Sequence, residues 1–131
     1  MALQVSSDVL SVLLAQAGEA HPRECCGILL GEGACITSTI PAANVHPDPH
    51  AHFEIDPQAL VDAHRAARNG GPQVLGYYHS HPNGLAEPSA TDRAMAAGDG
   101  AIWAIIAAGG VRFFRSGAGG FGALPYEVSA S

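Results

Sequence analysis

Lysine is absent from this sequence of 131 residues, and its six basic residues are all arginines. Acidic residues number twelve, so the formal net charge at pH 7 is -6. The arginines form no basic cluster, which a protein needs when it binds nucleic acid or an anionic membrane surface through its charge. The composition therefore argues against both kinds of partner.

Cysteine and long apolar runs are also scarce. Three cysteines without a spacing pattern fit a reducing compartment better than a disulfide framework. The first basic residue is Arg23, and Asp8 interrupts the early apolar residues, so the N-terminus lacks the pattern of a signal peptide. No apolar run approaches the ~18 residues that a membrane span requires. We expect a soluble, cytoplasmic protein.

Helix and strand signals alternate along the chain. Helical spacing of apolar residues after Ser6-Ser7-Asp8 predicts a first helix that ends near His21-Pro22, and Asp56-Pro57 predicts the N-cap and first residue of a second. Short apolar or β-branched runs bounded by glycine or proline predict strands. The predicted strands are 26–31, 34–41 (joined to the first as a hairpin), 53–55, 73–80, 101–108, 111–116 and 124–128. The sequence also predicts a short helix over 89–97 and loops over 42–52 and 117–122.

This order predicts one mixed β-sheet flanked by helices, in the α/β or α+β class. Hydrophobic residues make up 47% of the chain, enough for a core without disulfides. With no repeat and no linker, we predict a single domain over residues 1–131.

Two histidines, His79 and His81, lie one residue apart at the end of the predicted strand 73–80. Residues i and i+2 of a strand point to the same face, so both imidazoles can converge on one ion. Pro82 favours extended backbone at His81. The alternative, for such a pair on its own, is a hydrogen-bonded core histidine followed by a loop histidine.

Ser89 and Asp92 open the predicted helix 89–97. Ser-x-x-Asp is typical of a capping box, with Ser89 as N-cap and Asp92 at the third helical position. A carboxylate there can also bind a metal, and two histidines with one carboxylate leave a fourth position open, as in catalytic zinc sites. The spacing alone leaves both interpretations open.

Glu24 lies just before the apolar strand predicted over 26–31. It is either a solvated carboxylate, paired with Arg23, or a functional group. A hydrolytic zinc site needs a base that takes a proton from the bound water, and a glutamate that does not ligate the metal serves that purpose.

Taken together, these residues resemble the JAMM (MPN+) metallopeptidase motif, Glu…His-x-His-x7-Ser-x2-Asp. Every position and gap is matched, by Glu24, His79, His81, Ser89 and Asp92. The flanking segments "HPRECCGILLG" and "FEIDPQALVDAHRAA" are similar to the family as well. The resemblance covers about residues 1–107, and the tail after Val111 is similar only loosely.

The resemblance implies the JAMM/MPN (cytidine-deaminase-like) fold and a zinc-dependent peptidase or isopeptidase. It implies that His79, His81 and Asp92 bind one Zn²⁺ with water as fourth ligand. Glu24 would be the general base and proton donor, and Ser89 would hydrogen-bond the oxyanion.

The resemblance also suggests a substrate. Family members cleave after the C-terminal Gly-Gly of ubiquitin or ubiquitin-like proteins. Only 39 residues follow Asp92, which leaves little room for the long insertions of eukaryotic deubiquitinases. The chain most resembles small prokaryotic members that release cysteine from a sulfur-carrier protein or trim its C-terminus. An extended Gly-Gly tail would be held by strand addition to a sheet edge.

Two other functions fit part of the pattern. A non-haem Fe(II) oxygenase also uses two histidines and one carboxylate, but it gives Glu24 and Ser89 no role. A non-catalytic MPN-type module that binds a ubiquitin-like protein usually lacks some of the ligands, whereas here none is missing.

The remaining histidines and cysteines are weaker candidates. His46, His50 and His52 stand in a proline-rich loop that we expect to line the cleft rather than to bind a second metal. Cys25 and Cys26 point to opposite faces of a strand, one in the core and one near the site, and a cysteine nucleophile explains less than the histidine ligands. We expect His64 at the surface and Trp103 in the core.

Overall fold

The computed structural model describes residues 2–107 and 109–130, whose strands form one eight-stranded mixed sheet. Across the sheet, the strands are β7 (Gly120–Leu124), β6 (Gly110–Gly117), β5 (Ile102–Ala107), β4 (Gln73–Ser80), β2 (Cys26–Glu32), β3 (Cys35–Ala42), β1 (Leu3–Ser6) and β8 (Tyr126–Ser129). The helices of the described residues are α1 (Ser7–Ala20), α2 (Pro57–Arg68) and α3 (Ala90–Met95). None of these helices is both long and apolar enough to cross a membrane.

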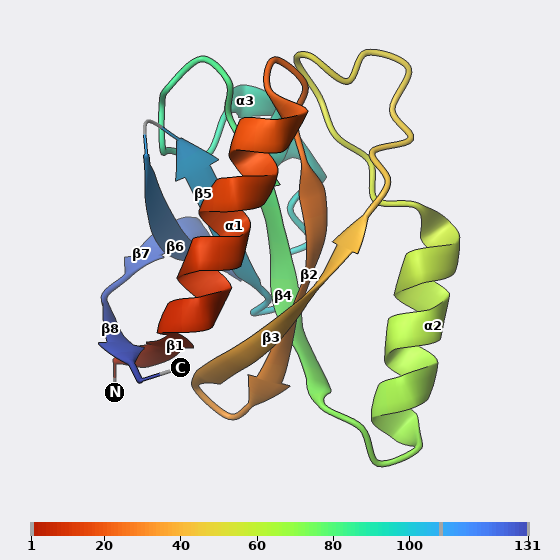
Figure 1. Cartoon of the computed structure of the whole chain (residues 1–131), viewed down its shortest axis with the longest axis vertical. Coiled ribbons are helices and arrows are strands. Elements are labelled where there is room, and N and C mark those ends of the chain that lie inside the picture. Colours follow the sequence, from red (N-terminus) through yellow and green to blue (C-terminus); the bar gives the residue numbers. More distant parts are fainter. Residues whose placement is uncertain (1, 108, 131) are drawn as a thin grey trace.

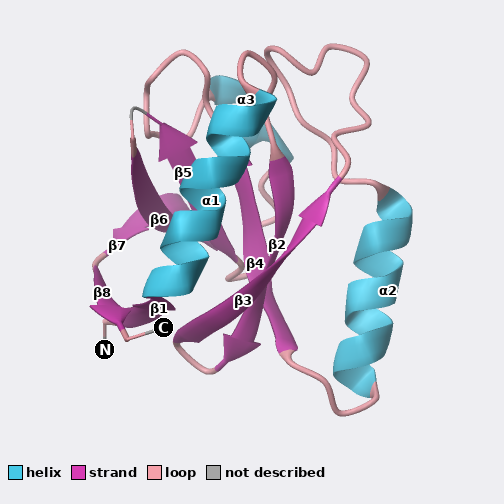
Figure 2. Ribbon diagram, viewed as in Figure 1, coloured by secondary structure: helices cyan, strands magenta, loops and turns pink. Residues whose placement is uncertain are grey.

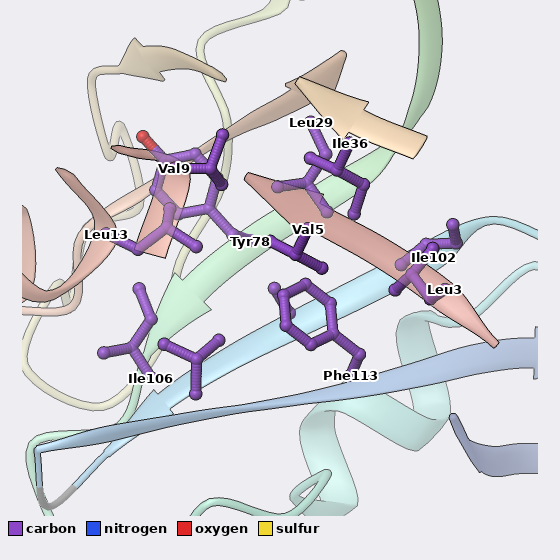
Figure 3. Close-up of a cluster of buried hydrophobic side chains, with 12 residues drawn as sticks. Leu3, Val5, Val9, Leu13, Leu29, Ile36, Tyr78, Ile102, Ile106 and Phe113 are labelled. Carbon is purple, nitrogen blue, oxygen red and sulfur yellow. The ribbon is translucent and has the colours of Figure 1, made fainter. Parts of the chain in front are cut away.

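Helix α1 covers one face of the sheet and crosses in front of the strands in Figures 1 and 2. It begins at an N-cap, where the Ser6 side chain accepts a hydrogen bond from the Asp8 N–H at 3.2 Å. Its buried residues Val9 and Leu13 join Tyr78 of β4 in the largest core cluster, as Figure 3 shows. Burial of this apolar surface is the main force that holds α1 on the sheet.

Helix α2 packs on the other face. Its Ala63 contacts Ile28 and Leu30 of β2, whereas Leu29 between them belongs to the cluster under α1. Successive strand residues point to opposite faces, and β2 is apolar and buried from Cys26 to Gly31, so it is covered on both sides.

Three segments that precede or follow the central strands meet at one end of the sheet. They are the turn 21–25 after α1, the loop 43–56 between β3 and α2, and the loop 81–89 between β4 and α3, all at the top of Figure 1. Strand β4 lies between the antiparallel β2 and the parallel β5, so its C-terminal end points into the middle of this group of loops. Polar side chains carried by these segments therefore surround the end of a buried strand.

The predicted fold class is confirmed, because one mixed sheet is flanked by helices in an α+β arrangement. Strand 73–80, the 26–31/34–41 hairpin, both longer helices with their N-caps, and Ser89 as cap of the short helix agree with the prediction. Ala108, part of the predicted strand 101–108, lies outside the described residues.

Three details of the sequence prediction were wrong. Residues 53–55 form no strand but a single bridge between Ile55 and Asn44, so the segment belongs to the loop. The predicted loop 117–122 is largely the β6–β7 hairpin, because Gly117 pairs with Gly120 and the strand continues to Leu124. Strand β1 was not predicted, because its four residues directly precede α1 and are too few to show a strand pattern.

Candidate metal centre

The two histidines of the motif converge at the end of β4. His79 is the second-last residue of that strand and His81 directly follows it, with its N–H donating to the Ile106 carbonyl of β5 at 2.9 Å. Both side chains are buried, and their Nε2 atoms lie 2.9 Å apart. The i, i+2 spacing thus places both imidazoles on one side, as the sequence indicated.

Asp92 completes a triangle with these histidines. Its Oδ2 lies 3.1 Å from Nε2 of His79 and 3.1 Å from Nε2 of His81, and the side chain is buried. The capping box is present as well: the Ser89 Oγ accepts from the Asp92 N–H at 3.0 Å, and Asp92 Oδ2 accepts from the Ser89 N–H at 2.9 Å. The capping interpretation of Ser-x-x-Asp is confirmed, and the cap places the Asp92 carboxylate beside the two histidines.

The hydrogen bond on the far side of His81 fixes its tautomer. Nδ1 of His81 lies 2.7 Å from the Leu85 carbonyl oxygen, which only accepts, so Nδ1 carries the proton. In the neutral ring, Nε2 then has a lone pair, and this lone pair points at a carboxylate oxygen. The Nε2 atom of His79 lies close to the same carboxylate oxygen and to Nε2 of His81. Such a convergence of acceptors needs a cation or a shared proton between them, and a backbone carbonyl behind the ring is the usual partner of a metal-bound histidine.

The donor set fits zinc. Zinc binds imidazole nitrogen and carboxylate oxygen at about 2.0–2.2 Å in tetrahedral geometry, which places ligand atoms about 3.3 Å apart. The three separations of 2.9, 3.1 and 3.1 Å are close to that value. Two nitrogens and one oxygen leave one tetrahedral position for water or substrate. The same donors also suit Fe(II), so the ligand atoms alone do not choose the metal.

Burial and pairing shift the pKa values of the three groups. For Asp92, burial would raise the pKa, but hydrogen bonds from His79, His81 and the Ser89 N–H outweigh it and hold the pKa well below its usual range. Burial lowers the pKa of His79, which keeps its ring neutral. For His81, burial lowers the pKa, but bonding to Asp92 and to the Leu85 carbonyl raises it more. Asp92 and His79 are thus held in the states that bind a metal, a carboxylate and a neutral imidazole, whereas His81 holds its proton more tightly without the metal and would release it on binding.

Glu24 lies beside this triangle. One ligand atom from each of Glu24, His79 and His81 falls within 4.8 Å of the others. Burial raises the pKa of Glu24 to about 7, with His81 opposing and the charges of Asp92 and Asp48 adding to the rise. The carboxyl group therefore exchanges its proton near neutral pH. His79 and His81 thus belong to two possible ligand sets, one completed by Glu24 and one by Asp92. The set with Asp92 is the better one, because its ligand atoms lie within 3.1 Å of one another rather than within 4.8 Å.

A small cavity opens in front of these groups. It has a volume of about 200 Å³ and is lined by Glu24, His50, Ala51, His81, Pro82, Asn83 and Ser89. The Ser89 hydroxyl accepts its capping bond and keeps its own proton for donation. A base, a hydrogen-bond donor and the ring of His81 thus border one space.

The loop 43–56 borders the cavity, as the sequence indicated. His50 lines the cavity, and within the described residues no loop histidine joins a group of three potential metal ligands. The rings of His46 and His52 lie 4.9 Å apart, and His46 Nδ1 accepts from the Asp48 N–H at 2.9 Å. His64 on α2 is exposed, as expected.

The cysteines are poorly placed for nucleophilic chemistry. Cys26 is fully buried beside Phe53 and Trp103, and burial raises the pKa of its thiol to about 12. Burial also raises the pKa of Cys25, which packs toward the α1 side of the sheet. A thiol reacts as its thiolate, and the raised pKa values disfavour the thiolate of both cysteines at neutral pH.

Sequence reasoning missed three residues that support the centre. Phe53 stacks on His79, the Leu85 carbonyl orients His81, and Asn44 holds the loop 43–56 together. Phe53 lies in the segment 53–55, for which the sequence predicts a strand. The Leu85 residue acts through its backbone carbonyl, which no side-chain pattern in the sequence can indicate. An asparagine inside a proline-rich loop was the one available hint.

Comparison with known proteins gives a consistent result. Residues 6–117 match the family model of prokaryotic homologs of the JAB domain. A desampylase from Haloferax volcanii is 33% identical over 114 residues, covering 82% of each chain. A probable TtuB-protein conjugate cleaving protease from Thermus thermophilus is 36% identical over 92 residues, 70% of this chain and 62% of the relative. A CysO-cysteine peptidase from Mycobacterium tuberculosis is 29% identical over 106 residues, covering 79% and 72%.

Solved structures share the fold. A protein from Desulfitobacterium hafniense superimposes with a TM-score of 0.86 at 27% identity, over 98% of this chain and 94% of that one. The structure described as a JAMM metalloprotease-like zinc site in the proteasome and signalosome gives a TM-score of 0.65 at 19% identity, over 98% and 99%. The second likeness bears on the fold alone.

Proposed function

The chain belongs to the family of prokaryotic homologs of the JAB domain, and on that premise we propose that it is a zinc-dependent peptidase. Its substrate would be the amide or isopeptide bond that follows the C-terminal Gly-Gly of a ubiquitin-like or sulfur-carrier protein. The names of three relatives support this substrate class: a desampylase, a protease that cleaves TtuB conjugates, and a CysO-cysteine peptidase. We further propose that residues 1–131 form one domain, since the described strands all join one sheet.

The observation that carries the proposal is the convergence of His79, His81 and Asp92. Their three ligand atoms lie within 3.1 Å of one another, with lone pairs directed at the same point. When bound there, Zn²⁺ would polarise the scissile carbonyl and lower the pKa of a water molecule to ~7. The hydrogen bond from His81 to the Leu85 carbonyl and the cap at Ser89 hold two of the ligands in place.

Glu24 would move the proton. With its pKa raised to about 7, it accepts a proton from the attacking water and later gives it to the leaving nitrogen as the C–N bond breaks. A glutamate with an ordinary pKa near 4 would return the proton readily but would be a much weaker base toward the water. The Ser89 hydroxyl, on the same cavity, would donate a hydrogen bond to the oxygen of the attacked carbonyl.

Zinc content tests the ligand assignment. We expect about one zinc per chain in the parent and almost none in His81→Ala, with His64→Ala as control because it removes an exposed histidine on α2. Equal zinc in the parent and His81→Ala would contradict the assignment. Retention of iron rather than zinc, after loading with both, would favour the oxygenase instead.

Cleavage tests the reaction. The zinc-loaded parent should cleave a ubiquitin-like protein whose Gly-Gly C-terminus is joined through an amide bond to a fluorescent lysine peptide. Glu24→Gln should bind zinc but lose most cleavage, because an amide cannot take the proton. A parent that binds the conjugate without cleaving it, with zinc present, would point to a non-catalytic binding module.

A further inference from the structure

Asn44 makes four hydrogen bonds with its side chain. Its Nδ2 donates to the carbonyl oxygens of Glu24 and His52, both at 3.0 Å. Its Oδ1 accepts from the N–H groups of His46 at 3.1 Å and Glu54 at 3.0 Å. These four bonds use both amide protons and both oxygen lone pairs, and the partners fit only one orientation of the amide.

One of these bonds reaches outside the loop 43–56 to the backbone of Glu24. The Glu24 carbonyl accepts from Asn44, and the Glu24 N–H donates to the Pro49 carbonyl at 2.7 Å. Glu24 precedes β2, so it has no strand partner of its own. Both of its backbone polar groups are therefore held by the same loop.

The next residue is fixed from the other side. The Cys25 N–H donates to Ser80 Oγ at 2.8 Å, and the Cys25 carbonyl accepts from the Ser80 N–H at 3.0 Å. Ser80 stands between the two histidines His79 and His81. The backbone at Glu24 is thus tied to the ligand-bearing end of β4 on one side and to Asn44 on the other.

The loop held by Asn44 also forms part of the centre. Its Phe53 stacks on His79, and its His50 and Ala51 line the cavity together with Glu24. The Asn44 amide crosses the loop between His46 and Glu54, so it closes the loop at its base while holding Glu24. The Asn44 side chain therefore links the backbone of Glu24 to the loop that walls the cavity, beside the bond from the Glu24 N–H to the Pro49 carbonyl.

We propose that Asn44 is a positioning residue that sets the place of the Glu24 carboxylate relative to the His79–His81–Asp92 centre. This inference rests on the proposed peptidase function. Proton transfer requires the base within hydrogen-bond reach of the water, and a displacement of about 1 Å can cost ~10²-fold in rate. An asparagine that only stabilised the loop would affect folding but would have no specific coupling to Glu24.

The test compares Asn44→Asp with Asn69→Asp in the zinc-loaded protein. Asn44→Asp keeps the acceptor oxygen but replaces the donor with an oxygen that faces the carbonyls of Glu24 and His52. Asn69→Asp makes the same chemical change at an exposed position after α2. With the Gly-Gly lysine-peptide conjugate, we expect kcat to fall about 10–100-fold in Asn44→Asp and KM to change little. Zinc per chain should match the parent, and Asn69→Asp should behave as the parent does.

A double-mutant cycle separates positioning from simple loss of structure. If Asn44 acts through Glu24, Asn44→Asp should lower the single-turnover rate of Glu24→Gln by less than about twofold, because the base is already gone. If Asn44 only stabilised the structure, Asn44→Asp would lower the rate by the same factor in the parent and in Glu24→Gln. Should Asn44→Asp not fold, Asn44→Ser replaces it, since the hydroxyl can still accept from the His46 N–H but cannot bridge to Glu24.

The outcomes are distinct. An unchanged kcat in a folded Asn44 variant, or the full loss of rate in the Glu24→Gln background, overturns the inference and leaves the proposed function standing. Loss of zinc in Asn44→Asp also overturns it, because the residue would then act on the ligands. A zinc-loaded parent that does not cleave the conjugate overturns the proposed function and the inference with it.

Discussion

The ring of Phe53 lies flat on the imidazole of His79, with centroids 4.2 Å apart and planes inclined by 15°. Trp103 meets the same imidazole edge-on at 5.7 Å. These contacts hold the ring of a buried histidine whose Nδ1 has no hydrogen-bond partner among the described residues. The orientation of Nε2 toward Asp92 therefore depends on packing rather than on a hydrogen bond behind the ring.

Phe53→Leu should weaken zinc binding by about 10-fold, because leucine keeps the site apolar but cannot hold the imidazole plane. Competition with a chromogenic chelator measures the dissociation constant. Phe114→Leu is the control, since Phe114 is buried to the same degree but contacts Phe121 and Arg112 instead. Both variants should lose similar thermal stability, and equal zinc affinity in the two would contradict a role for the stacking.

Ser89→Ala should lose both the cap and the hydroxyl donor. The lost cap should reduce the free energy of unfolding by about 1 kcal/mol, and the lost donor should lower kcat by roughly 10²–10³-fold. Ser6→Ala removes the equivalent cap of α1, away from the centre, so it should cost similar stability with no change in kcat. Ser89→Thr retains the hydroxyl and should retain most of the activity. If Ser89→Ala also retains most of the activity, Ser89 serves only as a helix cap.

The convergence of the three proposed ligands was predictable because it is local. His79 and His81 are two residues apart on one strand, and Asp92 follows at the start of the next helix. Strand periodicity and capping rules set the direction of these side chains without knowledge of the rest of the fold. Strands β2 and β5 were likewise visible, because their apolar runs are buried on both faces.

What the sequence left open depends on distant contacts. Glu24 reaches the centre only because β2 pairs with β4, which places Cys26 opposite His79. Phe53 lies in irregular backbone, so periodicity assigned it to a strand that does not exist. Strand β1 forms because β3 and β8 flank it, and neither partner can be deduced from its four residues. Non-local pairing is thus the part of this fold that sequence patterns miss.

Removal of the metal should abolish cleavage and leave the protein folded. The sheet is held by strand pairing and by an apolar core on both faces rather than by metal ligands, unlike the fold of a zinc finger. Zinc at a thousandfold excess over its dissociation constant should add about 4 kcal/mol, or roughly 10–20 °C in Tm. Calorimetry with zinc and with a chelator measures the shift, and His81→Ala should show none. Cleavage that persists in excess chelator would contradict a metal-dependent mechanism.

The raised pKa of Glu24 predicts a pH-dependent cost in the metal-free protein. The folded state holds a proton on this carboxyl up to pH about 7, whereas in the unfolded chain the ordinary value is 4.5. The folded state therefore binds more protons between these values, so the contribution of Glu24 to stability is present below pH 4.5 and is lost as pH rises through 7. The parent should become less stable than Glu24→Gln by roughly 1–3 kcal/mol over that interval.

Denaturant unfolding of the metal-free parent and Glu24→Gln at pH 5 and pH 8 measures this difference. Asp92, whose pKa is lowered, titrates below this interval, and the charge interaction between His81 and Glu24 is part of the difference measured. Glu19→Gln, which makes the same chemical change at an exposed position on α1, is the control. A constant difference at both pH values would mean that the carboxyl is ionised throughout. Glu24 would then lack the proton affinity near neutrality that lets one group serve first as base and then as acid.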